Sequence, residues 1–323
     1  MTIHRIHGCC CGGHIRKEAK RDPRRKGRPL PDTLLPEEAA YARAQQAYLA
    51  HWYAAVEENA WEAATITRLH VPPKVEAQIY DLSEQYIGAW MERSGESAAR
   101  EVGIHITDLI DRPKVRSAIQ QETYKFLDTA KASVKDSLRE TLTEGNKAGE
   151  NLKELAARVK QTLGFDPEKE VYVPADLEDP DIKLENWRAE RIARTESAQS
   201  ITMGEMAGWQ ESGVVSEVEW VASGDACEFC LDMDGETSPL GVPFFVVGDV
   251  LTVPGENGKM KIMEITYRDV YGPPLHPNDR CALKGVLSDE FQDHPHADDT
   301  REQIQPEERP PIEEEQEIFA PGD

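Results

Sequence analysis

The stretch from residue 186 to residue 220, NWRAERIARTESAQSITMGEMAGWQESGVVSEVEW, decides the fold class because its apolar pattern changes part-way along. Up to residue 212 it reads as one helix, and Gly213 is a suitable residue to end that helix. Beyond Gly213, the residues Val218, Trp220 and Ala222 alternate with other residues, which predicts a strand. Helical patterns dominate before this change and strand-like patterns after it, so we expect an α+β fold.

Long helices are predicted ahead of this change. Apolar residues recur at helical spacing within residues 35–64, 72–103 and 114–144, and a short helix within residues 143–165 is expected to end at Gly164. The longest helix, of about 30 residues, would extend for roughly 45 Å. Its apolar stripe consists of Val115, Ile119, Phe126, Leu127, Ala130, Val134, Leu138 and Leu142. Phe126, Ala130, Val134 and Leu138 have the spacing of partner anchors, and the alternative is that they pack inside the chain's own bundle.

A small β-rich region is predicted after the change. Residues 244–267, FFVVGDVLTVPGENGKMKIMEITY, read as two strands around the turn sequence GENG. We therefore divide the chain into four parts. These are a basic arm at residues 1–35, a helical region at 36–145, a compact C-terminal module at 146–287 and an acidic tail at 288–323. The arm has no sustained apolar period, and both ends are expected to be disordered.

The charge is spread unevenly over a chain of 323 residues with a net charge of −23. Residues 1–29 contain nine Lys or Arg and two Asp or Glu, whereas residues 288–323 contain thirteen Asp or Glu and two Arg. The basic arm is suited to double-stranded DNA or to an acidic protein surface, or it is merely solvated. No apolar run reaches 18 residues and the start resembles no secretory signal, so we expect no membrane span and a location in the cytosol.

Two short motifs carry the candidate chemistry. CEFC places Cys227 and Cys230 three positions apart, and HPNDRC supplies His276 and Cys281. In a reducing compartment this spacing favours a metal site over a disulfide, and four such ligands suit zinc, with Asp279 as a further oxygen donor. Three alternatives remain open, namely buried thiols without a ligand, a Cys–His nucleophilic pair and a redox pair. The tract HRIHGCCCGGH, with Cys9–Cys11, stays unassigned.

Over residues 115–285 the order of motifs resembles the phage Mu F-like family of head morphogenesis (minor capsid) proteins. The motifs are GENLKELAARV, RAERIARTESAQSITMGEMAGWQESGVV, VEWVASGDACEFCLDMDGE and PPLHPNDRCAL. Besides the four candidate metal ligands, the matching positions are Arg194, Thr195, Glu196, Trp220, Asp225, Gly235, Pro277, Asn278 and Arg280. The family often has cysteine where this chain has Asp279, so a metal here would use His276 or Asp279. Arg194 and Glu196 are too close in a helix to face each other, which predicts structural pairing with other elements.

The resemblance implies a non-enzymatic minor protein of a tailed-phage head. Such a protein would associate with the portal protein during procapsid assembly, contact major capsid or scaffold protein, and reside in the virion after assembly in the host cytoplasm. It could also act in DNA packaging or ejection. The alternative from a different class is an enzyme, either a thiol hydrolase or a transferase, that uses the Cys/His set of the module.

Overall fold

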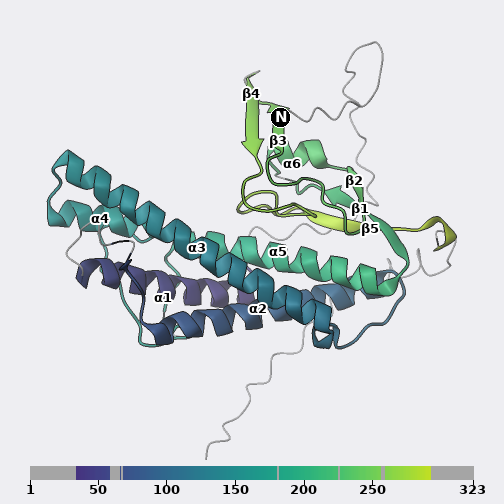
Figure 1. Ribbon diagram of the computed structural model, residues 1–323, viewed down its shortest axis with the longest axis horizontal. Coiled ribbons are helices and arrows are strands. Elements are labelled where there is room, and N and C mark those ends of the chain that lie inside the picture. Colours follow the sequence, from purple (N-terminus) through teal and green to yellow (C-terminus); the bar gives the residue numbers. More distant parts are fainter. Residues whose placement is uncertain are drawn as a thin grey trace, which may run out of the picture.

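The protein has an α+β architecture in which long helices are followed by a small strand region (Figure 1). The computed structural model describes residues 34–58, 66, 68–179, 182–224, 226–255 and 259–291. The predicted fold class is therefore confirmed. The predicted arm and tail lie outside the described residues, apart from residues 34–35 and 288–291.

Five helices form the first part of the structure, and three of them begin at a proline, which suits the first turn because it needs no backbone N–H there. They are α1 (Pro36–Glu58), α2 (Pro73–Glu101), α3 (Pro113–Ala148), α4 (Leu152–Thr162) and α5 (Trp187–Ser212), with a short 3₁₀ turn, η2 (Leu109–Asp111), between α2 and α3. As the sequence predicts, glycines with positive φ follow α4 and α5, at Gly164 (91°) and Gly213 (70°). Among the helices that the structure describes, none has the length and apolarity to cross a membrane.

The closest helix packing in this layer is between α2 and α5, which run side by side (Figure 1). Their backbones touch at glycines. A Cβ atom on Gly208 would lie 2.0 Å from the carbonyl oxygen of Gly95, and one on Gly95 would lie 2.6 Å from that of Gly204. Only residues without a side chain permit this approach, so the three glycines set the distance between the two helices.

The apolar stripe of α3 faces the chain's own core. Val134 and Leu138 are 3% and 0% exposed, in one apolar cluster with Trp52 of α1 and Ile79 of α2. The own-bundle alternative is therefore confirmed for Val134 and Leu138, because α1, α2 and α4 cover this part of α3. Their use as anchors for another protein is wrong.

A three-stranded antiparallel sheet follows the helices. Its central strand β1 (Val215–Val221) lies between β2 (Thr237–Pro239) and β5 (Ala282–Leu287), with Trp220 opposite Leu283. The remaining elements are α6 (Glu228–Met233), the hairpin strands β3 (Val250–Pro254) and β4 (Met260–Glu264), and a 3₁₀ turn, η3 (Asp289–Phe291). The predicted strand after Gly213 and the two strands around GENG are confirmed.

The sheet lies over α5, and the β3–β4 hairpin stands farther from the helices (Figure 1). Trp209 of α5 joins the apolar cluster of the strand region, which also contains Val218, Trp220 and Leu283. Since α4 and α5 pack with α1 to α3, the helical layer continues to Ser212, beyond the boundary that the sequence predicts at residue 145. Below, "helical layer" means residues 34–212 and "β-module" means residues 213–291.

Candidate metal centre

Two cysteines are placed by the start of helix α6. The chain turns after β1, where the backbone N–H of Ala226 donates to the carbonyl of Ser223 at 3.3 Å. Cys227 is the residue before the helix, and its carbonyl accepts from the N–H of Leu231 at 2.9 Å. Residues three apart in a helical turn project to one side, so Cys227 and Cys230 present their sulfurs together. Cys227 is half-buried and Cys230 is buried.

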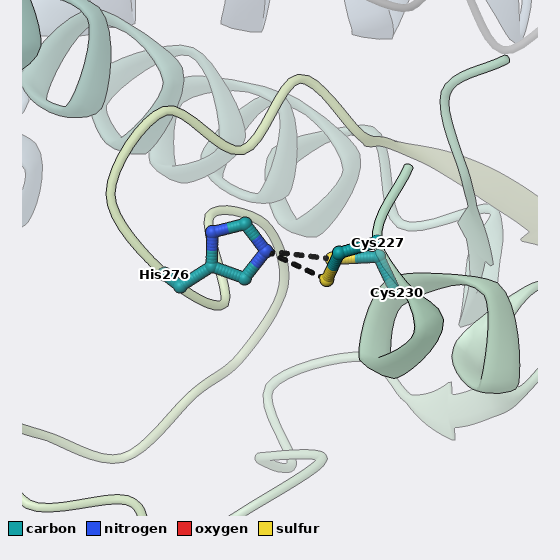
Figure 2. Close-up of side chains that lie close together, drawn as sticks. All are labelled: Cys227, Cys230 and His276. Atoms are coloured by element: carbon teal, nitrogen blue, oxygen red, sulfur yellow. Dashed lines mark hydrogen bonds between the residues drawn. The ribbon is translucent and has the colours of Figure 1, made fainter. Parts of the chain in front are cut away.

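His276 reaches from its loop toward both thiols (Figure 2). Its Nε2 lies 3.0 Å from the sulfur of Cys227 and 3.4 Å from that of Cys230. Its other nitrogen, Nδ1, lies 3.0 Å from the carbonyl oxygen of Pro277. A carbonyl only accepts, so Nδ1 carries the proton and, in the neutral ring, Nε2 directs its lone pair at the two sulfurs.

Cys230 belongs to two groups of side chains that could hold a metal ion. Cys227, Cys230 and His276 form one group and Cys230, Asp279 and Cys281 another, with all ligand atoms in each group within 4.8 Å of one another. The four ligands predicted from the sequence are therefore brought together, and the arrangement is compatible with a metal site.

Asp279 is committed to its own loop. Its Oδ2 accepts from the backbone N–H of Leu275 at 2.7 Å, and its Oδ1 accepts from that of Cys281 at 2.8 Å. The thiol of Cys230 also donates to Oδ2, at 3.5 Å. Asp279 thus fixes the turn that carries His276 and Cys281. Residues that hold potential ligands in place by hydrogen bonds are a common feature around metal sites.

The electrostatics around Cys230 oppose a free thiolate. A hydrogen bond with Cys281, burial, and the negative charge of Asp279 all raise the pKa of the Cys230 thiol. The thiol is therefore protonated at neutral pH unless a cation takes the place of its proton. A buried and protonated thiol is a poor nucleophile.

Two of the predicted motifs meet where this loop touches α5. Asn278 has a φ of 64°, a left-handed conformation that Asn adopts more readily than most residues. Its backbone N–H donates to the hydroxyl of Thr195 at 3.3 Å, and that hydroxyl donates to the carbonyl of Arg191 at 2.8 Å. The IARTE segment therefore holds the HPNDRC loop against the helical layer.

A buried ion pair makes a second connection. Nη1 of Arg280 lies 3.2 Å from Oε1 of Glu38, and the two side chains are 7% and 0% exposed. The hydroxyl of Ser197 donates to the same oxygen, and the N–H of Leu35 donates to the other carboxylate oxygen at 2.9 Å. Sequence reasoning missed Glu38, because it lies 242 residues from Arg280 and looks like an ordinary acidic residue of a first helical turn.

Other motif residues shape the β-module. Trp220 is fully buried and meets the ring of Phe244 edge-on, with 5.5 Å between the ring centroids. Gly235, with a φ of 84°, donates its N–H to the carbonyl of Trp220 at 2.8 Å. Pro277 accepts from His276, as described above. Asp225 lies outside the described residues.

Arg194 and Glu196 differ in their surroundings. Arg194 lies 3.9 Å from Glu190 of its own helix, a pair that the sequence did not lead us to expect. The Glu196 carboxyl group lies near charged groups of other elements, namely Arg268 and Glu122. Burial raises its pKa to about 8 although Arg268 acts in the opposite direction, and Glu122 raises it further.

Comparison with protein-family models, curated proteins and solved structures finds no match for this chain. The resemblance to Mu F-like proteins therefore rests on the motifs alone. Chemically, the cluster offers three sulfurs, one imidazole nitrogen and one carboxylate, a set that suits a soft or borderline cation.

Proposed function

We propose that this chain is a non-enzymatic structural protein of a tailed-phage head in which one zinc ion fixes the β-module. The order of its motifs supports the assignment to head proteins. In this proposal the portal protein is the main partner, and major capsid or scaffold protein is a further one. The chain is made in the host cytoplasm and resides in the virion, in the head interior or at the portal vertex, and its basic arm contacts double-stranded DNA.

The donor set supports zinc in particular. Structural zinc takes four ligands in a tetrahedron, and cysteine with histidine is a common combination. Cys227, Cys230 and His276 provide three ligands, and Cys281 provides the fourth because Asp279 already accepts two backbone hydrogen bonds. A single observation carries the zinc proposal. The Nδ1–H of His276 is oriented toward the carbonyl of Pro277, which leaves Nε2 aimed at two sulfurs. In metal-binding histidines the ring nitrogen that does not bind the metal commonly donates to such a carbonyl.

A structural role is better supported than a catalytic one. The loop with His276, Asp279 and Cys281 is fastened to α5 through Thr195 and to α1 through Glu38, so it is positioned to connect two parts of the protein. The raised pKa of Cys230 opposes thiolate chemistry there. The distance of 3.0 Å between Cys227 and His276 is what a nucleophile and its base would show, and it keeps the thiol hydrolase as the alternative.

Elemental analysis of the purified full chain tests the zinc proposal. We expect about one zinc per chain, and a chelator should lower both zinc content and thermal stability. Cys227→Ser and His276→Ala should each lose most of the zinc, whereas His105→Ala, at an exposed position on the helical layer, should keep it. Protein that contains no metal and is unaffected by a chelator would contradict the proposal. One unusually acidic thiol at Cys227 in metal-free protein would favour the hydrolase.

The head-protein proposal needs a separate experiment. Quantitative mass spectrometry of purified phage particles should find the chain in a low, fixed number of copies, and the chain should co-purify with portal protein. If the chain is absent from procapsids as well as from mature particles, the proposal fails even if zinc is bound. If it is present without zinc, only the metal proposal fails.

A further inference from the structure

A groove in the β-module lies between helix α6 and the β3–β4 hairpin and uses none of the Cys/His cluster. It has a volume of about 440 Å³ and is lined by residues of α6 and β3, by the segment between β2 and β3, and by Glu236, which lies between α6 and β2. Pro243, Phe245 and Val250 contribute apolar side chains to its lining. Val250 is 50% exposed, so part of this apolar lining is open to solvent.

The groove is also acidic. Asp232, Glu236 and Asp249 line it, and its lining contains no Lys or Arg. Asp232 and Glu236 are exposed. The surrounding β-module has fourteen Asp or Glu and five Lys or Arg, a net charge of −9. An occupant should therefore combine positive charge with compact apolar groups.

The chain itself contains one segment with this chemistry. Residues 1–29 carry a net charge of +7, whereas residues 34–212 carry −11 and residues 288–323 carry −11. The basic run RRKGR, at residues 24–28, is followed by Pro29, Leu30 and Pro31. Prolines at alternate positions favour an extended backbone, and such segments bind grooves lined by aromatic and proline side chains. Arginines beside the prolines would meet the carboxylates at the rim.

We propose that residues 24–31 of the N-terminal arm bind in this groove, with Pro29 and Leu30 on its apolar lining and the basic residues against Asp232, Glu236 and Asp249. The structure begins at Leu34, and an extended chain spans about 3.3 Å per residue, so the segment is tethered within about 30 Å of Leu34. The arm of the same chain or that of a second copy can supply it. This proposal does not depend on the head-protein assignment.

The acidic tail, residues 288–323, competes with the groove for the same arm. The two interactions differ in their dependence on salt and on the side chain of Leu30. Contact between the basic arm and the acidic tail is electrostatic and is screened by salt. Docking in the groove also buries Pro29 and Leu30, so it should persist at moderate salt and should be sensitive to a polar substitution at Leu30.

Carbodiimide cross-linking of the full chain tests the location directly, because it joins a lysine amine to a carboxylate in contact with it. We expect Lys26 to be joined to Asp232, Glu236 or Asp249, as identified by mass spectrometry. Cross-links from Lys26 that go only to residues 288–323 would overturn the proposal. A mixture of isotope-labelled and unlabelled chains shows whether the arm comes from the same chain or from a second copy, and either result agrees with the proposal.

Trypsin provides the second measurement, as the initial rate of cleavage after Lys26 in the full chain at moderate salt. The double variant Asp232→Lys, Glu236→Lys should raise this rate about tenfold, which corresponds to about 1.4 kcal/mol of lost docking free energy. The control variant Asp81→Lys, Glu140→Lys makes the same charge change at exposed positions of the helical layer and should leave the rate within about twofold.

Leu30→Asp keeps the test valid if the groove variant folds poorly, because residue 30 precedes the described structure. It should raise the cleavage rate like the groove variant. Equal rates for the groove variant and the control variant, or an unchanged rate for Leu30→Asp, would overturn the proposal. In that case the arm interacts with the chain through net charge alone.

Discussion

The helical layer and the β-module are stabilised by different means. In the helical layer, large side chains such as Trp52 and Leu138 fill an extensive apolar cluster, and α2 meets α5 backbone to backbone at glycines. The β-module has short strands, a two-stranded hairpin and long connections, and its buried centre includes Cys230 and Cys281. The difference teaches that side-chain packing holds the first region, whereas the second has a smaller apolar cluster and, in our proposal, is also held by a bound metal and by its attachment to the first.

That attachment is partly apolar, through Trp209 of α5, and partly polar, through one loop. The HPNDRC loop supplies candidate ligands to the cluster and, through Arg280 and Asn278, contacts Glu38 of α1 and Thr195 of α5. One loop therefore serves both regions. We expect substitutions in the helical core, in this attachment and at the α2–α5 contact to differ in how much they lower the unfolding free energy. We also expect them to differ in which regions of the protein they loosen.

The largest effect is expected from Val134→Asp, which places a carboxylate in the helical core. Val134 is 3% exposed, so the new charge has no water and no partner, and we expect a loss of about 4 kcal/mol or more in unfolding free energy. Ala132→Asp, at an exposed position of the same helix, should cost less than about 1 kcal/mol. Urea unfolding measures both. A fully stable Val134→Asp protein would contradict the packing of α3 described here.

Glu38→Ala should have the next largest effect, because it leaves Arg280 buried without its partner. Removing one side of a buried ion pair costs about 3 kcal/mol. Hydrogen exchange should increase at the start of α1 and also in residues 275–281 of the β-module. Glu38→Ala combined with Arg280→Met should recover part of the loss, since neither charge then remains. Increased exchange in α1 alone would mean that the two regions are not coupled through this pair.

A smaller effect is expected from Gly208→Ala, which separates α2 from α5. The added Cβ would lie 2.0 Å from the carbonyl oxygen of Gly95, and because backbone cannot yield as a side chain does, we expect a loss of about 2 kcal/mol. Gly88→Ala on α2 is the matched control. Its Cβ would meet only Ile119, at 3.9 Å, so the substitution should be neutral or stabilise by up to about 1 kcal/mol. Equal thermal stability of both variants would contradict the close contact.

Much of the fold followed from local patterns. The helix of residues 186–212, the glycine that ends it and the strand after it depend on residues near one another in the sequence, and all three are confirmed. The boundary at residue 145 did not anticipate that α5 packs with α2, because that contact depends on Gly95, Gly204 and Gly208. Glycines at these positions do not indicate a close contact between helices until the facing helix is known.

The sequence predicted which candidate ligands lie together but not the residues that hold them in place. CxxC and HPNDRC named Cys227, Cys230, His276 and Cys281 because metal ligands leave characteristic spacings. Asp279 is predicted as a further oxygen donor, and in the structure its carboxylate also holds the backbone of the turn. Glu38 could not be found at all, since a buried partner 242 residues away imposes no local pattern.

The smallest expected effect is a pH dependence that arises where α5 faces the end of α2. Burial, and then the negative charge of Glu101, raise the pKa of Glu205 to about 8. A carboxyl group in an unfolded chain has a pKa of about 4.3, so the folded protein holds the proton more tightly between these values. The folded form therefore loses stability as pH rises from about 4.5 to about 8.

Because Glu205 is in part accessible to solvent, screening reduces this loss to about 1 kcal/mol, or a fall of a few degrees in Tm. Glu205→Gln keeps the shape and removes the titration, so its Tm should fall less than that of the unchanged protein between pH 5 and pH 9. Calorimetry in the two buffers measures the difference. Glu140→Gln, at an exposed position of α3, is the control, and it should keep the full pH dependence of the unchanged protein. If the Tm of both variants changes with pH as in the unchanged protein, the carboxyl group of Glu205 is solvated. The contact between Glu205 and the end of α2 is then looser than the glycine contact beside it.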